Sequence, residues 1–75
     1  MMTLHNARIG NSYTVKALDL DDATKRRLEA LGLTVGTRIN VLNRNYGGAV
    51  ILMVRGSRLA VGAKIAETIL LKEAS

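Results

Sequence analysis

The sequence predicts a small, mainly β domain, in which about five short antiparallel strands curl into a barrel and one short helix follows the first strand. Apolar and polar residues alternate in several short runs, which is the period of a half-buried strand. Only the segment of about residues 22–31 has apolar residues at helical spacing. A chain of 75 residues has room for a single core, so we expect one domain over residues 1–75.

The N-terminal part is expected to form a turn followed by a strand. The turn is expected over residues 3–7, and its apolar side chains Leu4 and Ala7 are expected to be buried in the core. In the strand over residues 13–17, every second residue is apolar and is expected to face inward: Tyr13, Val15 and Ala17.

The helix over about residues 22–31 follows three acidic residues, Asp19, Asp21 and Asp22. We expect Asp21 or Asp22 to cap the helix, because a carboxylate accepts hydrogen bonds from the free N–H groups of a first turn. No glycine or distal glutamate completes a calcium loop, so the cap is favoured over a metal site.

The segment 26–37 indicates how the helix ends. Leu28 and Leu31 are three residues apart, so they are expected to share the face that meets the core. Gly32 is expected to take the left-handed conformation after the helix, which places Leu33 where a Schellman cap packs back on Leu28. Gly36 supplies a second flexible point before the next strand.

The rest of the chain is predicted to be β, with strands over residues 37–43, 50–54, 58–61 and 68–71 and a single helical turn over 62–66. Gly56 and Ser57 separate two strands by two residues, which indicates a tight hairpin. A small SH3-like barrel is the economical way to close these strands. The inward residues of this half are expected to be Ile39, Val41, Val50, Leu52, Val54, Leu59, Val61, Ile69 and Leu71.

The composition argues against most enzyme classes. The chain has no Cys and a single histidine, His5, so neither a thiolate site nor a histidine relay can be assembled. No glycine-rich phosphate loop is present, so nucleotide binding is unsupported. We therefore expect no enzyme activity, no cofactor and no metal site.

The charge pattern leaves two interpretations open. The net charge is +5, and no acidic residue lies between Ala30 and Ala66. This one-sign region favours an acidic partner or a polyanion, or is a solvated basic face that only keeps the domain soluble.

The N-terminus lacks the blocks of a signal peptide, and the longest apolar run, 49–54, is too short to span a bilayer. We expect a soluble, cytoplasmic protein without membrane insertion.

Four apolar residues are out of phase with the inward residues of their strands: Leu42, Ile51, Met53 and Leu70. A barrel this small cannot bury both faces of a strand. Either these side chains are covered within the domain by the helix and the N-terminal turn, since strand phase can slip by one residue at a bulge, or they form a protein–protein interface that includes possible self-association.

Two sequence motifs resemble a known family. The helix exit R-R-L-x-x-L-G-L-x-x-G, residues 26–36, and the run V-R-G-x-R-L-A-V, residues 54–61, are similar to those of ferrous iron transport protein A (FeoA). The resemblance extends to the SH3-like C-terminal domain of iron-dependent repressors. Relatives usually carry polar residues at the positions of Ile51 and Met53, and often arginines where this chain has Gly62 and Ala63.

The resemblance implies a cytosolic accessory of ferrous iron uptake that binds the cytosolic part of the permease, ferrous iron transport protein B, without carrying iron itself. The alternative is an RNA-binding small barrel of the SH3-like or KOW type, which would use its arginines on phosphates. Two tyrosines provide few rings for stacking bases, so nucleic acid is not the expected partner. The expected partner interface comprises Leu42, Ile51, Met53, Leu70, Arg26, Arg27, Arg55 and Arg58, and the expected structural motif comprises Leu28, Leu31, Gly32, Leu33, Gly36 and Gly56.

Overall fold

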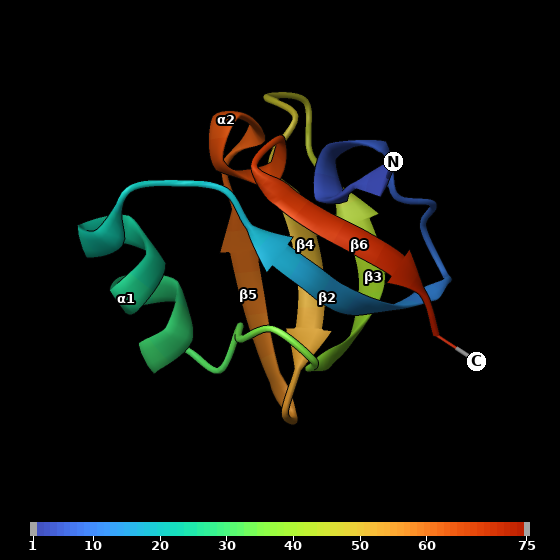
Figure 1. Cartoon of the computed structure of the whole chain (residues 1–75). Helices are drawn as coiled ribbons and strands as arrows, with labels where there is room; N and C mark the ends of the chain where they lie inside the picture. The colour runs from blue at the N-terminus through green and yellow to red at the C-terminus, as the bar shows by residue number, and fades with distance from the viewer. Residues whose placement is uncertain (1, 75) are drawn as a thin grey trace.

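The computed structural model describes residues 2–74 and shows one antiparallel sheet that folds over on itself. In chain order the elements are β1 (Met2–Thr3), η1 (Leu4–Asn6), β2 (Ser12–Leu18), α1 (Asp22–Ala30), β3 (Arg38–Arg44), β4 (Val50–Val54), β5 (Ser57–Val61), α2 (Ala63–Ala66) and β6 (Ile69–Glu73). The strand order is β1-β6-β2-β3-β4-β5. Figure 1 shows β2 and β6 crossing in front of β3, β4 and β5, with α1 to one side. The prediction of a mainly β barrel with a helix after the first long strand is confirmed.

The structure has one strand more than the sequence predicted. Thr3, expected to begin a turn, pairs with Leu70 of β6, and Met2 before it pairs with Leu71. A two-residue strand has no alternation to detect, so only its partner strand reveals it. The prediction for Leu4 and Ala7 is confirmed, because both are buried.

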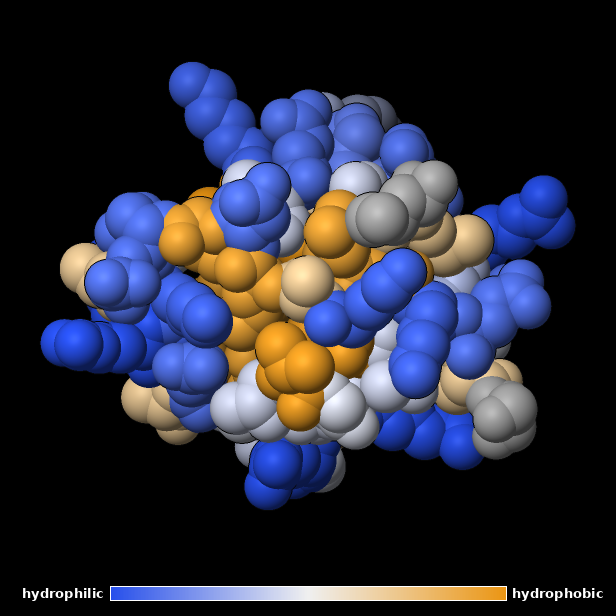
Figure 2. All heavy atoms as spheres, viewed as in Figure 1, coloured by the Kyte–Doolittle hydropathy of each residue, from blue (hydrophilic) through white to orange (hydrophobic). Residues whose placement is uncertain are grey.

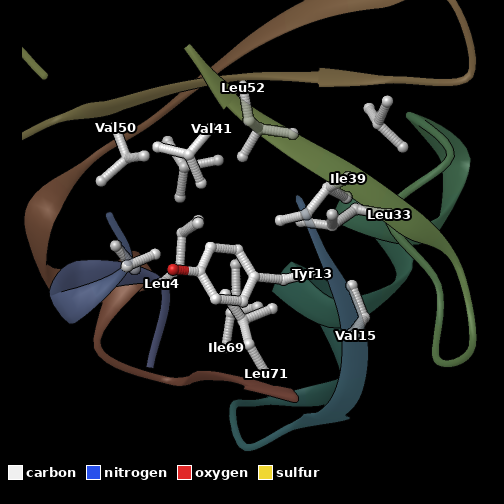
Figure 3. Packing of buried hydrophobic residues seen from close by; sticks show 14 of the residues in the cluster. Leu4, Tyr13, Val15, Leu33, Ile39, Val41, Val50, Leu52, Ile69 and Leu71 are labelled. Carbon is white, nitrogen blue, oxygen red and sulfur yellow. The ribbon is translucent and has the colours of Figure 1, made fainter. Parts of the chain in front are cut away.

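The core is entirely apolar among the described residues. Its centre is Tyr13, whose ring lies among Leu4, Ile69 and the β3 side chains in Figure 3. The Tyr13 hydroxyl accepts a hydrogen bond from the Arg8 N–H at 3.0 Å, so the one polar atom of this ring is satisfied.

Two bulges change the phase of strands. In β2 the register against β6 shifts between Val15 and Ala17, and in β3 the register against β4 shifts between Val41 and Asn43. After the first bulge Leu18 is buried and Ala17 is only half-buried, so the prediction that Ala17 points into the core was wrong. An extra residue in one strand turns every following side chain to the other face.

The helix α1 begins with an acidic N-cap, as the sequence predicted. Asp21 is the N-cap, and its carboxylate accepts a hydrogen bond from the Thr24 N–H at 3.1 Å. This bond holds the pKa of Asp21 below its ordinary value, because it stabilises the charged form. Of the two candidates for the cap, the structure selects Asp21.

Candidate partner-binding surface

The end of α1 is a Schellman cap built by Gly32. The Gly32 N–H donates to the Glu29 carbonyl at 2.9 Å, and the Leu33 N–H donates to the Leu28 carbonyl at 3.0 Å. Gly32 has φ +96°, and both Leu28 and Leu33 are buried, as the sequence predicted. The Gly36 N–H donates to the Val15 carbonyl at 2.8 Å with φ +90°, which ties the following turn to β2.

Leu31 does not face the core, so that prediction was wrong. It is the C-cap of α1 and is 55% exposed. The chain reverses at Gly32, and Leu33 takes the core position that helical spacing would have assigned to Leu31. Val35, two residues further on, is 57% exposed. We call the surface of Arg27, Leu31, Val35 and Arg55 the helix-exit surface.

Arg55 links this helix end to the β4–β5 hairpin. A Cβ placed on Gly32 would lie 3.1 Å from Arg55 Cδ and 3.6 Å from Nε, so the Arg55 side chain lies directly over the glycine. This brings a positive charge to the C-terminal end of α1, where the helix dipole is negative. Two segments more than twenty residues apart thus present one continuous surface.

The hairpin turn is shifted by one residue from the prediction. Val54 pairs with Ser57, so the two turn residues are Arg55 and Gly56, not Gly56 and Ser57. Arg55 has φ +50° and Gly56 has φ +81°, the signature of a type I′ turn. Gly56 is therefore required as predicted, and Arg55 is the one described residue other than glycine with positive φ.

Ile51 and Met53 lie together on the outer face of the sheet. Both are half-buried in β4, between buried neighbours that point inward. Across β5, Ile51 pairs with Ala60 and Met53 pairs with Arg58, and both of these partners are exposed. We call Ile51, Met53, Arg58 and Ala60 the outer hairpin face.

The other two out-of-phase residues lie on other strands, Leu42 beside the partner of Ile51 and Leu70 in another part of the sheet. Leu42 is the bulged residue of β3 and is 37% exposed. Leu70 is half-buried in β6, where it pairs with Thr3 of β1 and Ala17 of β2, strands in the opposite half of the sheet. Leu70 therefore does not share a strand neighbour with Ile51 or Met53, and the predicted interface divides into two parts, Leu70 in one and Leu42, Ile51 and Met53 in the other.

The basic residues predicted for the interface are all exposed, Arg26 and Arg27 on α1 and Arg55 and Arg58 around the hairpin. In Figure 2, apolar side chains gather beside α1 and hydrophilic side chains surround them. Within residues 2–74, no group of His, Asp and Glu side chains is placed to hold a metal ion, and no helix is long and apolar enough to cross a membrane.

Sequence reasoning missed a further exposed group. Ile9, Arg44, Asn45 and Tyr46 line an open hollow of ≈ 560 Å³. Arg44 has a structural role inside the domain, because its guanidinium donates hydrogen bonds to the carbonyls of His5 at 2.9 Å and Ala7 at 2.8 Å. The sequence signal for this group is Tyr46, an aromatic residue followed by two glycines in a loop, and the structure shows that it is fully exposed.

Comparison with known proteins identifies the family. The FeoA domain model matches residues 2–73. The chain belongs to the FeoA domain family. A curated relative from Methanocaldococcus jannaschii, named "Putative Fe(2+) transport protein A", is 32% identical over 99% of this chain and 89% of its own length.

Solved structures agree with this assignment. An FeoA protein from Chlorobium tepidum superposes with a TM-score of 0.91 at 27% identity, covering 99% of this chain and 71% of that one. A manganese-dependent transcriptional repressor gives a TM-score of 0.88 at 23% identity, covering 97% of this chain and 41% of the repressor, and so shares the fold. The predicted resemblance to FeoA is confirmed, and the resemblance predicted for iron-dependent repressors is confirmed as a fold shared with metal-dependent repressors. Family membership supports a role in ferrous iron transport.

Proposed function

We propose that this FeoA domain is a non-enzymatic, cytosolic accessory that binds the cytosolic part of the ferrous iron permease, FeoB, and supports or regulates iron uptake. The observation that carries the proposal is the Arg55–Gly32 contact, which joins the helix-exit surface to the β4–β5 hairpin. Exposed apolar side chains next to exposed arginines are typical of a protein-binding surface, because apolar contact supplies affinity and charge selects the partner.

The charge distribution supports a protein partner with an acidic surface. The acids before residue 30 lie just before α1 or on it, whereas residues 30–66 carry only positive charges. Arginine is favoured at such interfaces because its planar group binds carboxylates in two places at once.

The test is a calorimetric and NMR titration of the chain with the soluble cytosolic region of its own organism's permease. We expect a saturable complex whose shifted amides map to the helix exit and the hairpin. Absence of binding at the highest attainable concentration would refute the proposal.

Two matched variants separate the patches. The double variant Ile51→Glu, Met53→Arg is expected to keep the monomer fold and weaken the complex by about tenfold or more, since it places charges in the outer hairpin face. Leu70→Glu, in the opposite half of the sheet, is expected to bind as the parent does. Unfolding of the double variant would mean that Ile51 and Met53 are needed by the core, and equal loss in both variants would contradict a localised interface.

The RNA-binding alternative and self-association are tested in the same series. A short RNA is titrated at two salt concentrations, since binding through phosphate contacts weakens steeply as salt rises. Sedimentation of the free chain over a range of concentrations reports any self-association. Tyr46 is the one fully exposed ring of the described chain, which offers little for base stacking.

A further inference from the structure

The strand β5 ends the sheet, and its outer edge has no strand partner among the described residues. The sheet order places β5 last, next to β4 alone. The register is regular from Val54↔Ser57 to Val50↔Val61, without a bulge. Bulges and prolines are two of the devices that keep an edge from pairing with another chain, and β5 has neither; its one charged residue is Arg58.

The register shows which backbone groups the edge presents. In a two-residue hairpin the pair beside the turn, Val54 with Ser57, is hydrogen-bonded, and hydrogen-bonded pairs then recur at every second residue. The N–H and C=O groups of Ser57, Leu59 and Val61 therefore point to β4. Those of Arg58 and Ala60 point away from it, and within residues 2–74 they take part in no hydrogen bond.

The surroundings of this edge are positively charged. Arg55 precedes the strand, Arg58 lies in it, and Lys64 follows it on α2; all three are exposed. A second copy of the chain paired at the same edge would bring two Arg58 side chains to the same face, which is unfavourable. A segment with carboxylates would instead be attracted.

The outer face of the sheet next to this edge has room for a side chain of an added strand. Ala60 is small and exposed, and it stands between the edge and the half-buried Ile51. A side chain on an added strand opposite Ala60 can reach over its methyl group toward Ile51. A side chain two positions away would lie opposite Arg58, since the period of a strand is two.

We propose that the β5 edge binds an extended, acidic segment of a partner protein by strand addition, with a carboxylate beside Arg58 and an apolar side chain over Ala60 and Ile51. This mode takes its affinity from main-chain hydrogen bonds and its specificity from alternate side chains. The inference rests on the proposed function where the partner is the permease, and it names the mode by which that partner is held.

The experiment measures amide hydrogen exchange of the chain alone, with the permease's cytosolic region, and with a synthetic peptide that repeats Val-Thr-Glu-Thr, here called the Val-Glu peptide, in which Val and Glu fall two positions apart and so share one face. The Arg58 and Ala60 amides are expected to exchange fast in the free chain and at least about tenfold more slowly in either complex. The Leu59 amide, already bonded to β4, is the internal reference. The same peptide with Lys in place of Glu is the charge control and is expected to give no protection.

Two pairs of variants sharpen the result. Ala60→Pro removes an outward N–H that β4 does not use, and Ala60→Thr keeps that N–H in a good strand former. We expect Ala60→Pro to weaken binding about tenfold or more and Ala60→Thr to bind as the parent does. Arg58→Glu is expected to weaken binding of the Val-Glu peptide, while Arg58→Lys retains most of it. If Ala60→Pro does not fold, protection of the Arg58 and Ala60 amides in the parent chain decides whether the edge binds by strand addition.

Each outcome distinguishes this inference from the proposed function. Binding of the permease without protection of Arg58 and Ala60 overturns strand addition and leaves the proposed function standing. Protection by the Val-Glu peptide without binding of the permease supports the edge site and refutes the proposed function. Protection by neither overturns the edge site.

Discussion

The helix exit and the β4–β5 hairpin both reverse the chain with a glycine at positive φ, but they differ in the conformation of the residue beside that glycine. At the helix exit Gly32 alone is left-handed, and Leu33 returns to the core. In the hairpin Arg55 shares the left-handed region with Gly56. Asparagine or glycine is the usual choice at that turn position, since a larger side chain is strained there.

The difference indicates that the two turns have different roles. The helix exit satisfies its carbonyls and buries two leucines, so its sequence is explained by stability. The hairpin retains an arginine in a strained conformation, and what it gains is a side chain placed over Gly32. We expect the first turn to lose stability on almost any change and the second to tolerate changes that remove its interaction surface.

The largest effect is expected from Leu33→Ala. Leu33 is fully buried, so its truncation should lower the free energy of unfolding by about 2–5 kcal/mol through lost burial and a cavity. The matched control is Leu31→Ala, where the exposed side chain should change that free energy by less than about 0.5 kcal/mol. Denaturant unfolding measures both, and equal effects in the two variants would show that the assignment of inside and outside at the helix exit is wrong.

An intermediate effect is expected from Gly32→Val. The left-handed conformation should cost a branched residue about 1–2 kcal/mol in the free energy of unfolding, and its Cβ would also press on Arg55. Repeating the change in an Arg55→Ala background removes the contact and leaves the backbone penalty, so a double-mutant cycle separates them. An unchanged melting curve for Gly32→Val would rule out a role of the cap in stability.

The smallest effect is expected from Arg55→Asn, and its sign is opposite. Asn-Gly suits a type I′ turn, so the free energy of unfolding should rise by up to about 1 kcal/mol. Binding of the permease region should weaken at the same time, because the helix-exit surface loses its central charge. A variant that is more stable and binds equally well would show that Arg55 is not part of the interface.

Much of the fold follows from local patterns. The Schellman cap at Gly32 was predictable because the motif places a glycine between two leucines that can only meet if the helix stops there. The inward residues of β4 and β6 were predictable because they alternate without interruption, and those of β3 because Ile39 and Val41 precede its bulge. The N-cap was predictable to one of two neighbouring carboxylates, and only geometry selected Asp21.

The candidate interface was less predictable. Leu42, Ile51, Met53 and Leu70 were grouped because each breaks the phase of its strand, but phase does not report which strands become neighbours. The structure keeps Ile51 and Met53 together and separates Leu70 from them by the sheet order. Leu31 was wrongly assigned to the core because its spacing of three residues from Leu28 does not show that the helix ends at Leu31 and leaves its side chain exposed.

By itself the sequence determined the class of fold, the helix and its two caps, and the inward face of most strands, since these depend on residues close to one another along the chain. The tertiary structure alone decided where bulges turn a strand over, which strand is left at the edge, and that Arg55 lies over Gly32. Those features depend on pairing between distant segments, whose register is set by packing of the whole core and leaves no local mark.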